Sequence, residues 1–288
     1  MIWLKILKNK ILWLVLGALV LADFFIWLAI FESAPASKIK ADFFDVGQGS
    51  AIFLDAPGGN QVLIDGGPSD AILTKLGENL PLFDRKIELL VLTHSDADHL
   101  DGLIEVLKKY EIGAVLETGA EDGSANYLFW RELLKEKNVP VIYACLGQEI
   151  KIDDLEIKIL APAVKIAGQS QKSANNSSVV GKIIFGENSI LFTGDAESAE
   201  EAQLILNNID LKSDILAVGH HGGKNSSNTD FLASVAAQTA VIQVGKNNRY
   251  GHPAQETLAR LNGLEILRTD LSGDIEFECD LKECQRTD

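Results

Sequence analysis

Residues 93–99 read Thr-His-Ser-Asp-Ala-Asp-His and follow directly on an apolar run, 87–92, that predicts a buried strand. The stretch places two imidazoles and two carboxylates within six positions. Asp96 and Asp98 would repel one another unless a cation lay between them. Imidazole combined with carboxylate suits zinc or manganese. One acid could cap the helix expected over residues 101–109, but capping explains neither histidine. The stretch therefore predicts a divalent metal site at a strand end.

Two later strand ends carry the same residue types. The strand expected at 189–192 runs into Thr-Gly-Asp at 193–195, and the strand at 215–218 runs into Gly-His-His-Gly at 219–222. Strand ends followed by loops are where α/β enzymes place ligands and reactive groups. Every histidine of the chain falls at or just past such a strand end: His94, His99, His220, His221 and His252.

The chain from Lys38 onward is first strand-rich and then alternates strands with helices. Such a pattern packs as two sheets face to face, covered by helices, within one α/β domain over residues 37–288. The expected strands are 41–46, 51–54, 61–64, 87–92, 115–116, 141–144, 155–160, 178–185, 189–192, 215–218, 240–244, one near 266, and 275–277. The expected helices are 101–109, 127–137, one after 195, and 254–261.

Residues 1–36 differ from the rest of the chain. Three lysines, the last of them Lys10, precede an apolar run over residues 11–31 that is interrupted by Asp23. About 20 apolar residues cross a bilayer as a helix, so we expect a single N-terminal transmembrane helix with the domain outside the cytoplasm. The alternative is a signal segment cleaved after Ala36, because residues 34–36 have a small-x-small form, and the domain is then secreted.

The remaining domain is strongly acidic. Without residues 1–36 it has 23 basic and 39 acidic residues, a net charge of −16. Bulk electrostatics therefore give it no affinity for nucleic acid, and any phosphate must be bound by metal and local cations. Three cysteines are too few for a disulfide framework, although Cys279 and Cys284 are close enough to pair in an oxidising compartment.

The motifs together resemble the metallo-β-lactamase superfamily. Their fuller spelling resembles more closely still the extracellular metallo-β-lactamase-like domain of ComEC-type competence (DNA uptake) proteins. The resemblance covers roughly residues 38–280 and rests on segments in the same order: Phe-Asp-Val-Gly-Gln-Gly at 44–49, Leu-Ile-Asp-Gly-Gly at 63–67, residues 93–103, Asn-Asn-Ser-Ser-Val-Val at 175–180, Thr-Gly-Asp at 193–195, Val-Gly-His-His-Gly at 218–222 and Tyr-Gly-His-Pro at 250–253.

This resemblance implies a four-layer αβ/βα sandwich with one or two divalent metal ions, zinc or manganese, along one edge. It implies that His94 and Asp96 hold one metal position, and that Asp98 and His99 hold the other. Asp195 would bridge or lean to one of them. His220 would complete the second position, although the sequence leaves open which histidine of that pair ligates. Asp65 would orient the ligand loop from behind.

The chain also departs from the family pattern. Asp96 stands where most of the superfamily has histidine, and the usual third histidine of the first metal is missing. Ser50 follows the Gly-Gln-Gly turn, where competence-type domains resemble Gly-Gln-Gly-Asp. A site with fewer imidazoles and more oxygen ligands favours manganese or a weaker first metal. The residues found in the place of the missing histidine are Asn175, Asn176 and Ser178.

The chemistry expected is attack by a metal-activated water on a phosphodiester. Asp98 would both ligate and orient that water, while His221 or His252 would protonate the leaving oxygen. His252 could equally serve only as a hydrogen-bond partner for its loop. Residues expected to contact phosphate, unless they are merely solvated, are Lys224, Ser226, Lys246 and Arg249, and Tyr250 would stack on a base or form a wall of the site.

We therefore predict an exported metal-dependent phosphodiesterase or nuclease that acts on DNA or another phosphodiester. An esterase or choline-phosphate hydrolase of envelope polymers would use the same metals. A non-enzymatic metal-binding component of a DNA-uptake complex is the third hypothesis. One apolar segment cannot form a DNA channel, so the expected partner is a separate multi-helix membrane channel protein.

Overall fold

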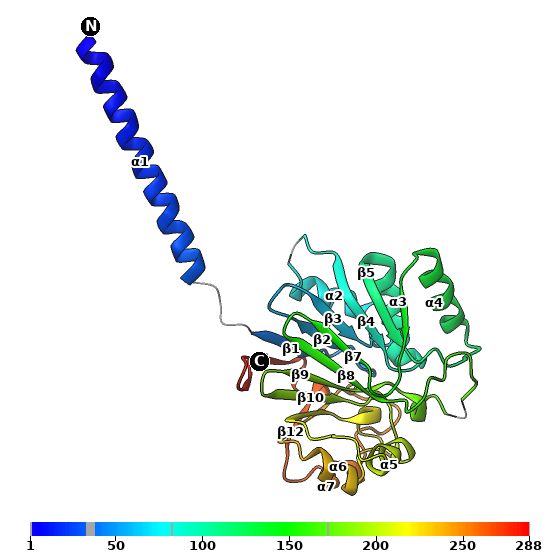
Figure 1. Cartoon of the computed structure of the whole chain (residues 1–288). Helices are drawn as coiled ribbons and strands as arrows, with labels where there is room; N and C mark the ends of the chain where they lie inside the picture. Colours follow the sequence, from blue (N-terminus) through cyan, green and yellow to red (C-terminus); the bar gives the residue numbers. More distant parts are fainter. Residues whose placement is uncertain (1, 33–37, 82, 172, 288) are drawn as a thin grey trace. The chain divides into compact units, whose positions relative to one another are not determined.

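The computed structural model describes residues 2–32, 38–81, 83–171 and 173–287. The chain divides into two compact units, Met1–Ser37 and Lys38–Asp288. The first unit contains one helix, α1 (Ile2–Glu32) (Figure 1). Among the described residues, no helix has both the length and the apolarity that crossing a membrane requires. The transmembrane helix predicted from the sequence is therefore not supported.

The second unit contains two mixed sheets (Figure 1). The first sheet has the order β15-β14-β1-β2-β3-β4-β5-β6, and the second has the order β13-β12-β11-β10-β9-β8-β7. Their strands are β1 (Ile39–Phe43), β2 (Ile52–Asp55), β3 (Gln61–Ile64), β4 (Lys86–Leu92), β5 (Glu111–Glu117), β6 (Val141–Tyr143), β7 (Glu149–Ile152), β8 (Leu155–Ala161), β9 (Val180–Phe185), β10 (Asn188–Phe192), β11 (Ile215–Ala217), β12 (Thr239–Ile242), β13 (Glu265–Arg268), β14 (Ile275–Cys279) and β15 (Cys284–Arg286).

Each sheet contains a parallel block. Strands β3 to β6 pair in parallel in the first sheet, and β10 to β13 pair in parallel in the second. The carboxyl ends of parallel strands lie at the same edge of a sheet. Residues that follow β4, β10, β11 and β12 are therefore brought to common edges, although they lie far apart in the sequence.

The helices of this unit are α2 (Ala71–Asn79), α3 (Ala97–Lys109), α4 (Ala125–Glu136), α5 (Ser198–Leu206), α6 (Thr229–Val235), α7 (Gln255–Arg260) and α8 (Thr269–Ser272), with short 3₁₀ turns η1 (Asn175–Ser177) and η2 (Gly219–Gly222). One apolar core lies between the sheets. A second packs the first sheet against α2, α3 and α4, and a third packs the second sheet against α5, α6 and α7 (Figure 1). This confirms the predicted αβ/βα sandwich.

Helix α3 begins four positions earlier than the sequence predicted, so that Asp98 and His99 lie in its first turn. Asp96 is the residue at its cap position, but its side chain makes no capping hydrogen bond. The capping explanation for these acids therefore has no support in the structure. Helices α2, α6 and α8 were not predicted, because each is short.

Candidate metal centre

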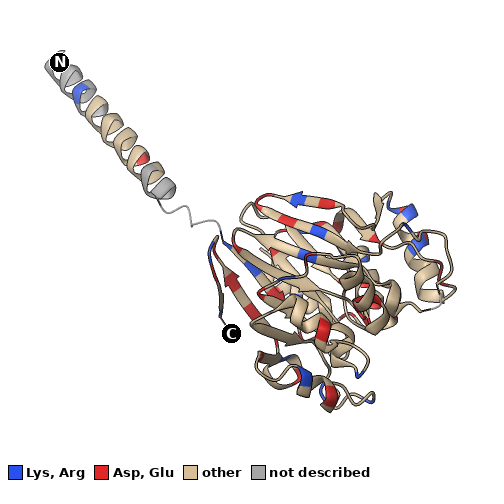
Figure 2. Cartoon of the chain, turned by 60° about the horizontal axis from the view of Figure 1, so that its bottom comes forward, with Lys and Arg blue, Asp and Glu red and all other residues tan. Residues whose placement is uncertain are grey.

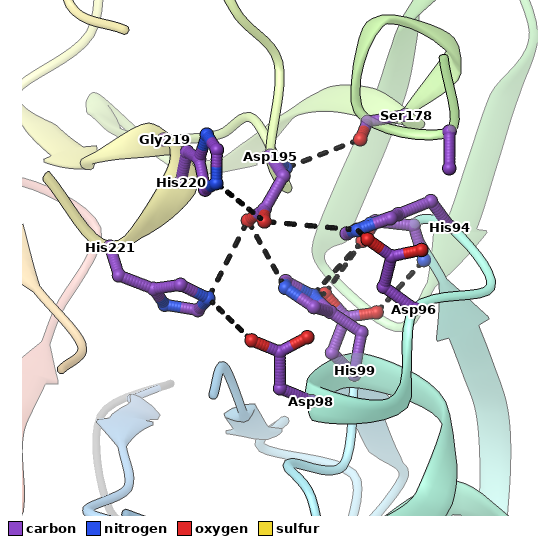
Figure 3. A network of polar contacts seen from close by, with 12 residues as sticks. His94, Asp96, Asp98, His99, Ser178, Asp195, Gly219, His220 and His221 are labelled. Carbon is purple, nitrogen blue, oxygen red and sulfur yellow. Dashed lines mark hydrogen bonds and ion pairs between the residues drawn. The ribbon is translucent and has the colours of Figure 1, made fainter. Parts of the chain in front are cut away.

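Three loops and one helix start converge at the edge of the sandwich (Figure 3). The loop after β4 carries His94 and Asp96, and the first turn of α3 adds two more side chains. Segments that follow β10 and β11 provide the remainder from the second sheet. The converging side chains are His94, Asp96, Asp98, His99, Asp195, His220 and His221.

The buried carboxylate of Asp195 lies at the centre of this group (Figure 3). Its Oδ1 is 3.1 Å from Nε2 of His99 and 3.7 Å from Nε2 of His221. Its Oδ2 is 3.8 Å from Nε2 of His94 and also 3.8 Å from Nε2 of His220. One carboxylate thus faces four imidazoles, as a bridging ligand would.

Several of these polar atoms are buried without a hydrogen-bond partner in the described part of the chain. They are Nε2 of His94, His99 and His221, Nδ1 of His220, and Oδ1 of Asp195. Buried polar atoms normally have a hydrogen-bond partner. A set of nitrogen and oxygen atoms that converge on one place without such partners therefore fits a bound cation. Two groups of ligand atoms lie within 4.8 Å of one another: His94 with His99 and Asp195, and Asp98 with His99 and His221.

His99 cannot serve both groups. Its Nδ1 lies 2.7 Å from Oδ2 of Asp65, which leaves the single lone pair of Nε2 for one ion. If that ion sits with Asp98 and His221, the other position retains His94 and Asp195. Asp96, whose Oδ2 is 3.6 Å from Nε2 of His94 and which is half-exposed, can complete it. The two positions then differ, one richer in imidazole and the other richer in oxygen.

Asp65 lies behind the candidate ligands His94 and His99, where the family resemblance placed it. It is buried, and its carboxylate accepts hydrogen bonds from the backbone N–H and the hydroxyl of Thr93 at 2.8 Å each. Together with the contact to His99, these bonds fix both the loop and the ring. The sequence did not single out Thr93, although its position between the end of β4 and His94 could have indicated a role in holding the loop.

The buried charged groups of the centre shift one another's pKa values. Burial alone would raise the pKa of Asp98, but the His221 imidazole, whose Nε2 lies 3.3 Å from the carboxylate, and the charge of His99 bring that pKa down to about 2. Burial would lower the pKa of His99, yet the carboxylates of Asp195 and Asp65 hold it well above the usual range. The pKa of Asp195 lies well below normal, because nearby imidazoles outweigh its own burial. The buried carboxylates thus need cationic partners, which protons or a metal can supply.

The paired histidines of η2 have different surroundings. His221 is buried, and its Nδ1 lies 2.8 Å from the carbonyl oxygen of Gln243, so Nε2 faces Asp98 at 3.3 Å. His220 is one-quarter exposed, and its Nδ1 lies 3.1 Å from Oε1 of Glu197. The family resemblance implied His220 as the ligand, although the sequence left the choice within the pair open, and His221 or His252 was the expected proton donor. In the structure His221 belongs to a candidate ligand group, whereas His220 flanks it.

His252 lies beside this pair, with its ring centroid 5.2 Å from that of His220. Burial, followed by the charges of His220 and His221, lowers its pKa. Tyr250 stacks on His252 at a centroid distance of 6.0 Å, and Arg249 donates a hydrogen bond to the Tyr250 hydroxyl. A layered group of side chains thus leads from His220 to the exposed ring of Tyr250.

The predicted cations do not form a broad basic face. Basic and acidic residues are interspersed over the unit Lys38–Asp288 (Figure 2). Lys224 is exposed and pairs with Glu256 at 2.8 Å, and Lys246 is exposed in the loop that leads to Tyr250. Contact with phosphate by these residues remains a prediction.

The polar residues that replace a third histidine have local hydrogen-bonding roles. The hydroxyl of Ser178 accepts a hydrogen bond from the backbone N–H of Asp195. Asn176 accepts from the backbone N–H groups of Glu197 and Glu200 at the start of α5. Asn175 is half-buried in η1, where its carbonyl accepts from Ser178. These residues set the position of Asp195 and of the segment that follows it.

Ser226 has a role that the sequence did not suggest. It is fully buried, and its hydroxyl lies 2.8 Å from the carbonyl oxygen of Gly219 and 2.9 Å from that of Gly223. Its one proton is therefore committed to the backbone of the histidine turn, which leaves no donor for the expected phosphate contact.

A pocket of about 300 Å³ opens beside the centre on the side of His94 and Asp96. Its other walls come from the loop after β5 and from the segment before η1, and include Glu117, Tyr127 and Gln171. The centre is therefore reachable by a small group, although most of its ligand atoms are buried.

Comparisons with known proteins agree with this geometry. Residues 44–246 match the family model of the metallo-beta-lactamase superfamily. The chain is 32% identical to ComE operon protein 3 of Bacillus subtilis over 264 residues. This alignment covers 84% of this chain and 33% of that protein. It is 28% identical to competence protein ComA of Neisseria gonorrhoeae over 252 residues, 85% of this chain and 33% of that protein. The chain thus spans about a third of the length of these relatives.

Similar solved structures include the metallo-beta-lactamase fold protein YhfI from Bacillus subtilis. It has a TM-score of 0.56 and 13% identity, and the match covers 84% of this chain and all of that one. The metallo hydrolase Igni18 from Ignicoccus hospitalis has a TM-score of 0.50 and 15% identity, and the match covers 88% of this chain and 99% of that one. At such identities these likenesses show the fold alone. The sandwich, the histidine–aspartate centre and the match over residues 44–246 together establish that the chain belongs to the metallo-β-lactamase superfamily.

Proposed function

We propose that the chain is a metal-dependent phosphodiesterase, of nuclease type, that acts on DNA or another phosphodiester. The observation that carries the proposal is the convergence of three orphaned imidazole nitrogens on the buried carboxylate of Asp195. Relatives whose names refer to competence support the choice of DNA as substrate. They are about three times longer, so this activity is proposed for this chain on the strength of its own site.

The residues present fit one or two divalent ions. Asp98, His99 and His221 would hold one ion, and His94, Asp96 and Asp195 would hold or share the other. Zinc suits the imidazole-rich position, and manganese suits the oxygen-rich one. When bound, such an ion supplies a hydroxide near neutral pH and offsets charge on phosphoryl oxygens.

The chain's own residues would bind and orient the substrate and move a proton. Asp98, which is part-exposed, can accept a hydrogen bond from the attacking water and orient it. With His221 assigned as a ligand, the proton for the leaving oxygen would come from His220 or His252, whose rings lie next to each other. Arg249 and Tyr250 lie beyond His252, where they can contact the next part of the substrate.

A location outside the cytoplasm is also part of the proposal. Cys279 and Cys284 form a disulfide between β14 and β15, a pairing that the sequence left open. Disulfides persist in oxidising compartments and are rare in the cytosol, which supports export of the domain. A separate multi-helix membrane channel remains the proposed partner.

The test uses the full chain, stripped of metal and then loaded with manganese or zinc. Substrates are single-stranded DNA, duplex DNA and bis-p-nitrophenyl phosphate. We expect metal-dependent cleavage that disappears in an Asp98→Ala, His99→Ala double variant and persists in Glu105→Gln, on the outer part of α3. Cleavage of the small ester alone would favour hydrolysis of envelope polymers over a nuclease. A folded, metal-loaded protein that cleaves none of them would refute the enzymatic proposal.

A further inference from the structure

The turn that carries His220 and His221 has a backbone conformation that residues other than glycine rarely adopt. Both residues have left-handed conformations, with φ of 51° and 53°. For residues other than glycine, such a conformation is unfavourable, and it persists only where the surroundings impose it. The turn aims Nε2 of His221 at Asp98 and Asp195. The contacts that impose the turn are therefore important for the centre.

One set of contacts comes from Arg260, the last residue of α7. Its guanidinium donates hydrogen bonds of 2.8 Å to the carbonyl oxygens of Lys224, Ser226 and Ser227. It also donates to the hydroxyl of Thr257, which in turn donates to the carbonyl of Gly223. A planar, permanently charged donor group thus collects the carbonyls of the segment that directly follows the histidine turn.

A second set of contacts comes from Glu201 on α5, which is 2% exposed. Its carboxylate accepts hydrogen bonds from the backbone N–H groups of Ser227 and Asn228 and from the side-chain amide of Asn228. Burial raises the pKa of Glu201, while these donors and Arg260 act to lower it. A buried carboxylate is tolerated only with such partners, so its role is to hold this segment.

Ser226 connects the held segment to the turn. Its carbonyl accepts from Arg260, and its hydroxyl reaches the carbonyls of Gly219 and Gly223, one on each side of the two histidines. We propose that Glu201 and Arg260 form a two-sided clamp on residues 224–228 and act as positioning residues for His221. This inference rests on the proposed role of His221 as a metal ligand.

The test compares Arg260→Gln with Arg268→Gln. Arg268 is a matched control, because its part-buried guanidinium makes two hydrogen bonds to Asp270 and none to the histidine turn. We expect Arg260→Gln to weaken zinc or manganese affinity, measured by calorimetry, at least tenfold, within the range known for residues behind metal ligands. Arg268→Gln should stay within about twofold of the wild type. In Arg260→Ala, millimolar methylguanidinium should recover part of the lost affinity.

A second measurement needs no metal. In the metal-free protein, the Nδ1 proton of His221 is shielded by its contact with Gln243, and NMR can follow its exchange with water. We expect faster exchange in Arg260→Gln, and also in the milder variants Arg260→Lys and Glu201→Gln, at conditions where all are folded. Unchanged exchange and unchanged metal affinity in folded variants would overturn the clamp. Faster exchange in variants of a protein that binds no metal would instead retain the clamp and overturn the proposed function.

Discussion

His221 and Gln243 are joined by a hydrogen bond of 2.8 Å from the imidazole Nδ1 to the backbone carbonyl oxygen. The side-chain amide of the same glutamine donates to the carbonyls of Phe44 and Ala51, which lie at the two ends of the segment that connects β1 to β2 in the first sheet. Gln243 follows β12 of the second sheet. One residue therefore orients a candidate ligand and ties the two halves of the sandwich together beside it.

Replacing Gln243 with methionine should affect both stability and metal binding. The change keeps the volume but removes donors to two buried carbonyls, which costs about 1–3 kcal/mol. We expect a fall of that size in the free energy of unfolding, measured by urea denaturation. Metal affinity should fall by tenfold or more, since the carbonyl that orients His221 loses its anchor. A stability loss with unchanged affinity would contradict this coupling.

The two adjacent histidines should respond differently to removal. His221→Ala deletes a buried nitrogen of a candidate ligand group, so we expect fewer metal ions per chain by elemental analysis. His220→Ala removes a part-exposed ring beside Glu197, so metal content should be retained while turnover falls about 100-fold, a typical loss for a proton donor. The reverse pattern would assign the ligand role to His220, as the sequence suggested.

The sequence predicted the centre because its residue types are tied to strand ends. Thr-His-Ser-Asp-Ala-Asp-His follows β4, and Thr-Gly-Asp follows β10. Parallel pairing sets the end of β4 beside that of β3, and the end of β10 beside that of β11, and face-to-face packing of the two sheets brings the two edges together. The same logic predicted the two sheets and most of their helices. These features depend on local apolar patterns and on short motifs, which a single sequence displays.

Other features depend on backbone conformation and long-range contacts, which a sequence does not display. The choice between His220 and His221 is set by two left-handed residues. The roles of Gln243 and Arg260 arise from contacts that are distant in sequence. Gln243 contacts His221, 22 positions away, and Arg260 contacts Lys224, 36 positions away. Ser226 was predicted to contact phosphate because it offers a hydroxyl donor close to Lys224 in a loop after the histidine pair, whereas its burial commits the hydroxyl to the turn.

Removing the metal should lower thermal stability. An ion that binds only the folded state at a hundred times its dissociation constant adds about 2.7 kcal/mol to the free energy of unfolding. For a domain of this size, we expect chelation to lower the melting temperature by about 5–10 °C, measured by calorimetry. The Asp98→Ala, His99→Ala variant serves as the control, because it should show no such shift. An equal shift in that variant would place the stabilising ion elsewhere.

The last prediction concerns Asp42, a buried carboxyl in β1 and remote in sequence from the centre. It is 1% exposed, and its Oδ2 has no hydrogen-bond partner within the described residues. Burial, reinforced by the charge of the cross-strand neighbour Glu276, raises its pKa from 3.8 to about 7. A raised carboxyl pKa means that the folded state holds the proton more tightly than the unfolded chain does.

The raised pKa of Asp42 therefore contributes to the free energy of unfolding. This contribution is fully present below pH 4 and is lost as the pH rises through about 7. Asp42→Asn keeps the shape without the charge, so it should unfold less readily than the wild type at pH 8 and about equally at pH 4. A shift of about three units corresponds to at most about 4 kcal/mol. Urea denaturation across this range measures the difference, with Asp70→Asn, at an exposed position before α2, as a control that follows the wild type. If the wild type and Asp42→Asn instead run parallel from pH 4 to 8, Asp42 is already ionised in the folded protein and has a cation beside it.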